Sequence, residues 1–231
     1  MRLNELLNKL NDEQREAAED IYGPSMVIAG PGAGKTFTLV VRTANMIHSG
    51  IPADKIILFT FTKKAALEIK ERVIATIGDE AKKIMVGTYH SVCNRFLRKY
   101  ASYIGLTKNF SILDTEDCKK IAKEIIKVSG LNYEADKLLW KISDYKCKLI
   151  NPSDALRNAS NTIESHMAQL YYLYSERLLK DNCCDFDDLI YKTVRLLEQY
   201  PEIRSEINHA YQYIVAKLIG PYYGDVVCVS L

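Results

Sequence analysis

The sequence lacks the patterns that mark metal-binding, secreted and membrane-spanning chains. Its six cysteines include no CxxC pair, and its four histidines make no ligand spacing with them. No apolar run approaches the roughly 20 residues that a membrane helix needs. The opening residues, MRLNELLNKLND, have leucines at helical spacing instead of the apolar block of a secretory leader. We therefore expect reduced thiols, no membrane partner and a soluble protein of the cytoplasm.

Net charge is also low. The 231 residues carry a formal net charge of +2, so composition neither indicates nor excludes a nucleic-acid partner, and a basic surface would have to arise from local clustering. The length and the hydrophobic content of 48% suffice for one large or two small globular domains. We find no internal repeat, low-complexity tract or linker in the sequence.

Short β-rich runs alternate with helical patterns up to about residue 110. Such alternation is typical of parallel βα units, so we expect an α/β core. Each predicted strand precedes a helix candidate: 25–29 before 36–48, 55–62 before 63–77, and 83–89 before 90–104.

The middle of the chain has a different character. From about residue 114 to 180 the pattern is one of polar helices with tyrosines and lysines, without an obvious strand run. We expect a helical insertion or second domain there. A further helix opens at DFDDLI, another begins at Pro201, and residues 211–215, YQYIV, predict a strand that returns to the sheet.

A glycine-rich stretch follows the first predicted strand. Residues 29–36, AGPGAGKT, have the spacing of a phosphate-binding loop, with Ala29 in place of the usual first glycine. In such loops glycines let backbone N–H groups point inward, and the positive end of the next helix meets the phosphates. Lys35 would reach the β- and γ-phosphates, and the Thr36 hydroxyl would hold Mg²⁺. The alternative is a Gly-Pro turn between a core strand and a helix.

Gln14 lies in LNDEQREAA, about 15 residues before this loop. A glutamine amide can donate to N7 and accept from N6 of adenine in one plane, so it can select ATP over GTP. The alternative is a solvated glutamine on a helix surface. The candidate ATP-binding residues from both stretches are Gln14, Ala29, Gly30, Pro31, Gly32, Ala33, Gly34, Lys35 and Thr36.

Together these motifs resemble the UvrD/Rep/PcrA family of superfamily-one DNA helicases, along nearly the whole chain up to Val215. LNDEQREAA is similar to the family's adenine-specifying motif and AGPGAGKT to its phosphate loop. ILFTFTKKAALEIKERV (57–73) and VGTYHSVCNRFL (86–97) are similar to two DNA-contacting motifs. CDFDDLI (184–190) matches a signature near the end of the family's inserted helical domain. The five motifs occur in the family's order and spacing.

The resemblance implies a RecA-like parallel-sheet motor core with an inserted all-helical subdomain, which uses ATP and Mg²⁺ to move 3′ to 5′ along single-stranded DNA. We expect the motor core at 1–110 and 187–216, the helical insertion at 111–186, and a tail without family likeness at 217–231. Phe37 joins the ATP-binding set, because many relatives carry there a cation that can lie over adenine, and an aromatic ring could stack instead.

The resemblance also implies a DNA-facing set at the ends of two strands. Small hydroxyls, aromatic rings and lysines at the start of a helix offer phosphate donors and a face for base stacking. Most relatives have asparagine where Lys63 stands, and a lysine should keep the phosphate contact. The alternatives are a core position for Phe61 and for His90, with the lysines on a solvated face. The DNA-facing set is Thr60, Phe61, Lys63, Lys64, Thr88, Tyr89 and His90.

The carboxylates of DFDDL allow a metal site or a helix start. Asp185 is a good N-cap, and Asp187 and Asp188 would lie in the first turn, where the helix dipole favours carboxylates. We adopt the structural interpretation.

The acidic pair of the family's hydrolytic site is missing. Ala216, Lys217 and Leu218 stand where the resemblance places an apolar residue, the metal-binding aspartate and the water-orienting glutamate. We interpret the chain as the N-terminal half of a helicase, with a premature or rearranged C-terminus, in which Lys35 belongs to an incomplete catalytic site. It would bind ATP, bind single-stranded DNA weakly, and neither hydrolyse nor unwind alone.

Three other interpretations stay open. A non-motor protein could bind DNA or a partner as a regulator, and the chain could self-associate through the face that would meet a second motor domain. A small-molecule kinase could carry the same loop, although LNDEQREAA and TFTKKAA argue against it.

Overall fold

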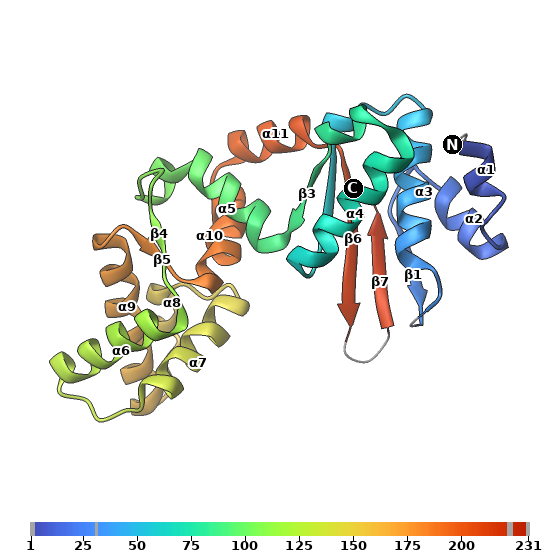
Figure 1. Ribbon diagram of the computed structural model, residues 1–231. Helices are drawn as coiled ribbons and strands as arrows, with labels where there is room; N and C mark the ends of the chain where they lie inside the picture. Colours follow the sequence, from blue (N-terminus) through green and yellow to red (C-terminus); the bar gives the residue numbers. More distant parts are fainter. Residues whose placement is uncertain (1–2, 31, 221–223, 230–231) are drawn as a thin grey trace. The chain divides into compact units, whose positions relative to one another are not determined.

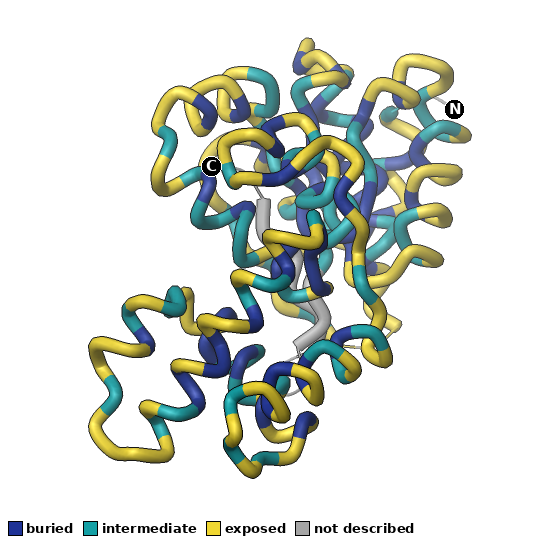
Figure 2. The backbone as a smooth tube through the Cα atoms, turned by 90° about the vertical axis from the view of Figure 1, so that its left-hand side faces the viewer, coloured by how far each residue is buried: buried dark blue, intermediate teal, exposed yellow. Residues whose placement is uncertain are grey.

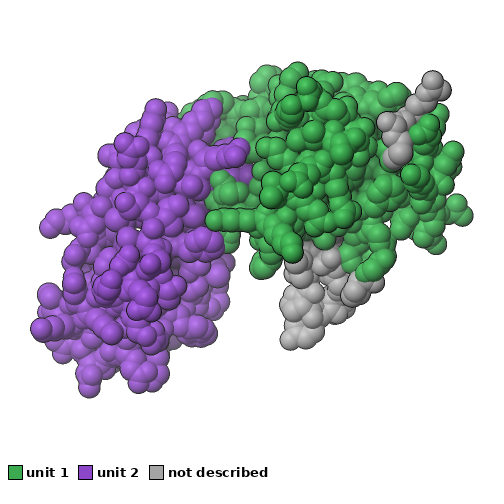
Figure 3. Space-filling model, in the orientation of Figure 1, with its two compact units in different colours: residues 1–91, 202–231 green, residues 92–201 purple. Residues whose placement is uncertain are grey.

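The computed structural model describes residues 3–30, 32–220 and 224–229, and the chain divides into two compact units (Figure 3). Unit 1 comprises Met1–Ser91 and Glu202–Leu231, and unit 2 comprises Val92–Pro201. Unit 2 is therefore inserted into the sequence of unit 1. Residues 92–110 and 187–201 make most of their contacts within this helical unit. The predicted limits of the family's domains, at 110 and 187, remain a prediction.

Unit 1 is built on a five-stranded sheet with the order β1-β7-β6-β2-β3 (Figure 1). β2 (Ile56–Thr60) pairs in parallel with β3 (Met85–Thr88) and with β6 (Tyr213–Gly220). β7 (Gly224–Val229) pairs antiparallel with β6 and with β1 (Ser25–Ala29). The α/β fold with a parallel sheet is confirmed. The returning strand, β6, extends beyond the predicted end at residue 215 because its later residues pair with β7. β7 is not predicted by the sequence, and it lies between β1 and β6 in the sheet.

Helices cover this sheet and supply the other half of its core. Buried side chains of β2 and β6, such as Leu58 and Val215, pack with Leu39 and Ile69 from two of these helices. Burial of apolar surface of this kind is the main stabilising term in folding. α1 and α2 pack beside α3 (Figure 1). The helices of unit 1 are α1 (Leu3–Leu7), α2 (Asp12–Glu19), α3 (Lys35–His48), α4 (Lys63–Ile77) and α11 (Pro201–Ala210), with short 3-10 turns at Ala53–Lys55 and Asp79–Lys83.

Unit 2 is helical, as the sequence predicts. Buried positions recur along its helices between exposed ones (Figure 2), and residues such as Leu138, Leu170 and Tyr171 form its core. Two-residue strands β4 (Ser111–Ile112) and β5 (Cys183–Cys184) pair in parallel. Its helices are α5 (Tyr89–Lys99), which begins in unit 1, α6 (Thr115–Ser129), α7 (Ala135–Cys147), α8 (Pro152–Arg157), α9 (Thr162–Lys180) and α10 (Phe186–Gln199), with a 3-10 turn at Ala101–Ile104. Among the described residues no helix is long and apolar enough to cross a bilayer.

A buried ion cluster fixes the start of α10. Asp185 is its N-cap and forms a capping box with Asp188, which favours the structural interpretation of DFDDL. The Lys146 ammonium of α7 lies 2.5 Å from Asp185 Oδ2 and 2.9 Å from Asp188 Oδ1, and the Tyr174 hydroxyl donates to Asp185. Burial raises the pKa of Asp185. Burial would also raise the pKa of Asp188, but the ammoniums of Lys146 and Lys192 outweigh it and lower that pKa.

We expect Lys146→Met to destabilise unit 2, because two buried carboxylates would lose their counter-charge. Removing one partner of a buried ion pair costs about 3–5 kcal/mol, whereas an exposed pair contributes about 0–1 kcal/mol. Urea unfolding measures the difference, with Lys137→Met, which breaks an exposed pair with Glu134, as the matched control. Equal loss in both variants would contradict the prediction. If Lys146→Met does not fold, adding Asp185→Asn and Asp188→Asn should restore folding.

Candidate nucleotide site and nucleic-acid edge

The glycine-rich loop joins β1 to α3 as its sequence predicts. β1 ends at Ala29, and α3 begins at Lys35 with Gly34 as its N-cap. Gly32 and Gly34 have φ angles of 78° and 72°, a left-handed conformation that glycine adopts without steric cost. The start of α3 carries the positive end of the helix dipole, so this helix end suits an anion. Pro31 lies outside the described residues.

Lys35 is buried beneath the loop. Only 9% of its surface is exposed, and its ammonium donates to the carbonyl oxygens of Ala29 at 2.8 Å and Gly30 at 2.6 Å. The two carbonyls thus hold the charge beside the backbone that a phosphate would approach. A bound phosphate would compete with them for the same N–H donors, as expected for a charge-assisted contact.

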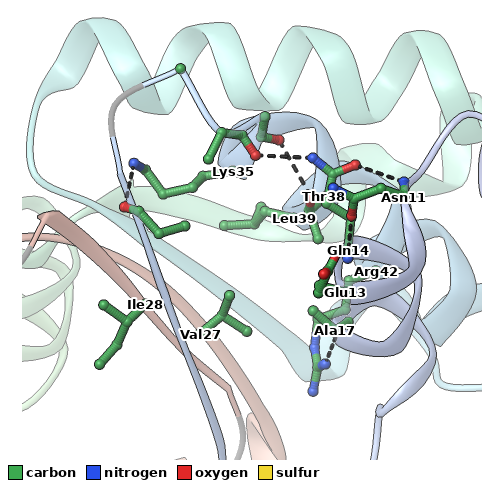
Figure 4. A pocket seen from close by; sticks show the side chains of 14 residues that line it. Asn11, Glu13, Gln14, Ala17, Val27, Ile28, Lys35, Thr38, Leu39 and Arg42 are labelled. Carbon is green, nitrogen blue, oxygen red and sulfur yellow. Dashed lines mark hydrogen bonds between the residues drawn. The ribbon is translucent and has the colours of Figure 1, made fainter.

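Gln14 lies against the same loop (Figure 4). Its Nε2 donates to the Ala33 carbonyl at 3.0 Å, and its Oε1 accepts from the Asn11 backbone N–H at 3.1 Å. Asn11 caps α2 in return, so the side chain is fixed at both ends by a capping box and by the loop. A primary amide has two donor hydrogens and two acceptor lone pairs, so one of each is left for a base. A Cβ at Gly34 would lie 2.7 Å from Gln14 Nε2 and would displace that side chain, while the φ of 72° at Gly34 is what favours glycine at this position.

A pocket of about 660 Å³ lies between α2, β1, the loop and α3 (Figure 4). This volume is within the usual range for small-molecule sites. Arg42, which is 2% exposed, lines it and donates to the Ala17 carbonyl of α2 and to Ser25 Oγ of β1. Burial lowers the pKa of Arg42, and Asp20 partly opposes this. Sequence reasoning misses Arg42, although an arginine on an apolar helix face is a usable signal.

A second, smaller hollow borders the end of the loop and the first turn of α3. It is lined by residues 32–37, Arg72 and Lys217, and the Lys217 ammonium donates to Thr36 Oγ1 at 3.2 Å. The lysine that replaces the expected aspartate thus contacts the hydroxyl expected to hold Mg²⁺. Phe37 lines this hollow and packs against the buried Leu6 and Val41, so its stacking on adenine stays a prediction.

The residues around Thr36 do not fit a magnesium ion. Magnesium prefers oxygen ligands, usually with one or two carboxylates. The lining of this hollow contains no carboxylate, and the described part of the chain contains no group of three or more acidic, histidine or cysteine side chains placed to hold a metal. An ammonium beside the hydroxyl would also repel a divalent cation.

The two predicted DNA-contacting stretches meet at one edge of the sheet. Thr60 at the end of β2 pairs in register with Thr88 at the end of β3. Their hydroxyls have internal roles: Thr60 Oγ1 donates to the Thr62 carbonyl, and Thr88 Oγ1 accepts from the Ser91 N–H. Both residues are buried, so these two threonines offer little surface to a ligand.

Phe61 and the lysines of this edge are exposed. Phe61 is 66% exposed, which excludes a core position, and Lys63 and Lys64 are exposed in the first turn of α4. Tyr89 stacks on Phe59 with ring centroids 4.7 Å apart, and His90 is half-buried. The edge therefore presents one aromatic ring and two ammoniums beside a helix start.

The strand, glycine-rich loop and lysine-initiated helix on a partly parallel sheet define a phosphate-loop α/β protein with a helical insertion. A family model described as the UvrD/REP helicase N-terminal domain matches residues 10–216. The chain is 38% identical over 223 residues to a probable DNA helicase II homolog of Mycoplasma capricolum, which covers 93% of this chain and 31% of that relative. It is 37% identical over 216 residues to the ATP-dependent DNA helicase PcrA of Staphylococcus aureus, which covers 92% of this chain and 30% of the relative.

The chain therefore belongs to the UvrD/REP helicase N-terminal domain family. The resemblance seen in the sequence motifs is confirmed. The chain spans about 30% of the length of the curated relatives that it matches.

Proposed function

We propose that this chain is an ATP-binding part of a UvrD/Rep-type DNA helicase, with weak affinity for single-stranded DNA. The observation that carries the proposal is the contact between Gln14 Nε2 and the Ala33 carbonyl, 3.0 Å apart. It joins a base-reading amide to a phosphate loop beside a pocket of about 660 Å³. The Staphylococcus aureus relative is named an ATP-dependent DNA helicase, and for this chain that activity is a proposal.

ATP should bind more tightly than GTP, and this preference should depend on Gln14. Gln14→Glu keeps an acceptor for the Asn11 N–H but removes the amide donor, so it should abolish the preference while preserving the α2 cap. Lys35→Ala should weaken ATP binding by about tenfold or more, equivalent to about 1.4 kcal/mol. Equilibrium titration with labelled ATP and GTP measures both effects.

Two exposed positions provide controls for that titration. Gln199→Glu and Lys83→Ala make the same changes at exposed positions outside the loop, and they should leave both affinities unchanged. Equal affinity of the unaltered chain for ATP and GTP, or no loss in Lys35→Ala, would contradict the proposed site. Thermal melting of each variant separates loss of binding from loss of folding.

Single-stranded DNA should bind weakly through the exposed edge, and salt should weaken the binding further. Base stacking on an aromatic ring contributes about 1–3 kcal/mol, so Phe61→Ala should reduce affinity by about fivefold or more. Lys64→Ala should reduce the salt dependence, because one phosphate contact fewer releases fewer counterions. Fluorescence anisotropy with a labelled oligonucleotide measures both.

Tyr22→Ala is the matched control for Phe61→Ala. Tyr22 is 67% exposed and precedes β1, which places it at the opposite edge of the sheet from the residues that follow β2. An affinity that does not change with salt, or that falls equally in both variants, would contradict DNA binding at this edge. DNA binding that is retained in a nucleotide-free sample would favour the non-motor role, and self-association stays a prediction.

ATP hydrolysis by the 231-residue chain should remain at background, with or without DNA. Phosphoryl transfer depends on metal ions and charged groups that stabilise the transition state, and a single arginine can be worth about 10³ to 10⁵ in turnover. Here Lys217 and Leu218 stand in place of the expected carboxylates. A phosphate-release assay should give the same rate for the chain and for Lys35→Ala. DNA-stimulated release that disappears in Lys35→Ala would contradict this prediction.

A further inference from the structure

Lys217 places a fixed positive charge at the phosphate loop. It lies on β6, where the neighbouring Ala216 pairs with Phe59 of β2, so the backbone that carries the lysine is held within the sheet. Its half-buried side chain reaches Thr36, and the two Nζ and Oγ1 atoms are 3.2 Å apart. The sequence separation is 181 residues, so the contact depends on the tertiary fold.

The hollow around this contact is cationic. Its volume is about 470 Å³, and the residues that line it include Lys35, Arg72 and Lys217 but none with a carboxylate. Arg72 is paired with Glu68 one turn earlier on α4, at 2.6 Å, so its charge is partly compensated. The N-terminal end of α3 adds the partial positive charge of the helix dipole. An anion that enters the hollow therefore meets the Lys217 ammonium, the partly compensated Arg72 and a helix end.

The Thr36 hydroxyl faces an ammonium here, in the direction where a metal site would hold an ion. A hydroxyl that ligates Mg²⁺ turns an oxygen lone pair toward the ion, and here Thr36 Oγ1 offers a lone pair to the Lys217 ammonium instead. Its own hydrogen is then available to donate to a phosphate oxygen. The ammonium supplies positive charge at the place where the ion would supply it, and charge-assisted hydrogen bonds to phosphate are the strong ones.

We propose that this site binds a triphosphate chain in its metal-free form, with the Lys217 ammonium in place of Mg²⁺. The inference rests on the proposed nucleotide-binding function, and it names the ionic form of the ligand. The ligand class is a polyphosphate anion, carried by a nucleotide or free as inorganic tripolyphosphate. The site prefers the free anion because a magnesium complex would bring a divalent cation against the lysine.

Isothermal titration of the full chain with ATP, once in excess Mg²⁺ and once in excess EDTA, tests this inference. ATP should bind at least as tightly in EDTA as in Mg²⁺. Lys217→Asp should reverse the order and prefer Mg²⁺ by about tenfold or more, which is about 1.4 kcal/mol. Lys217→Gln should lose affinity in EDTA without a gain in Mg²⁺. Lys83→Asp, at an exposed position outside the loop, should behave as the unaltered chain.

Inorganic tripolyphosphate separates the phosphate chain from the base. It should displace ATP from the chain in EDTA, and this competition should be lost in Lys217→Gln. Equal competition in the chain and in Lys217→Gln would overturn the role of Lys217.

The outcomes distinguish this inference from the proposed function. Binding of ATP by the unaltered chain only when Mg²⁺ is present would overturn the inference and leave the nucleotide site intact. ATP binding by Lys217→Asp in Mg²⁺, with none by the unaltered chain in either condition, would show that the lysine blocks the site, and it too would overturn the inference. No ATP binding by any variant would instead overturn the proposed nucleotide site. Thermal melting confirms that each variant is folded.

Discussion

The shared direction of four strands decides where most candidate functional groups of unit 1 lie. β2, β3 and β6 are parallel, and β1 runs the same way because β7 is antiparallel to both β1 and β6. The carboxyl ends of these strands therefore emerge at one edge, which is where open α/β sheets usually bind ligands. The phosphate loop follows β1, and the exposed Phe61 follows β2. Lys217 lies on β6 next to Ala216, which pairs with Phe59 near the end of β2.

A single buried guanidinium holds the nucleotide side of that edge together. Arg42 bonds the Ala17 carbonyl and Ser25 Oγ, so it connects α3 to α2 and to β1. Burying a charge is costly unless hydrogen bonds compensate it. The buried Arg42 is therefore stabilised only when α2 and β1 are in place to accept its hydrogen bonds. Gln14 is on the same helix as Ala17, so its approach to the loop depends on this connection.

The sequence predicts local structure well and long-range contacts poorly. Residues 25–29 and 63–77 match β1 and α4, because alternation, caps and glycines are local signals. The ion cluster around Lys146 and the contact of Lys217 with Thr36 join residues 39 and 181 positions apart, and periodicity carries no information about such pairs. β7 is also missed, although its valines are typical of a strand, because residues 217–231 do not resemble the family and are interpreted as a tail. The sequence also leaves open whether Phe61 is buried or exposed, and only the folded structure shows that it is exposed.

The insertion of β7 between β1 and β6 changes the distance that a side chain must span. Adjacent strands lie about 4.8 Å apart, so two strands separated by a third lie about 10 Å apart. A short carboxylate on β6 would need an intermediary, such as a bound ion, to interact with a hydroxyl that follows β1. The four-carbon stem of lysine makes the crossing itself. Side-chain length at residue 217 therefore substitutes for a bridging atom, and a change there alters both the sign of the charge and the reach across the sheet.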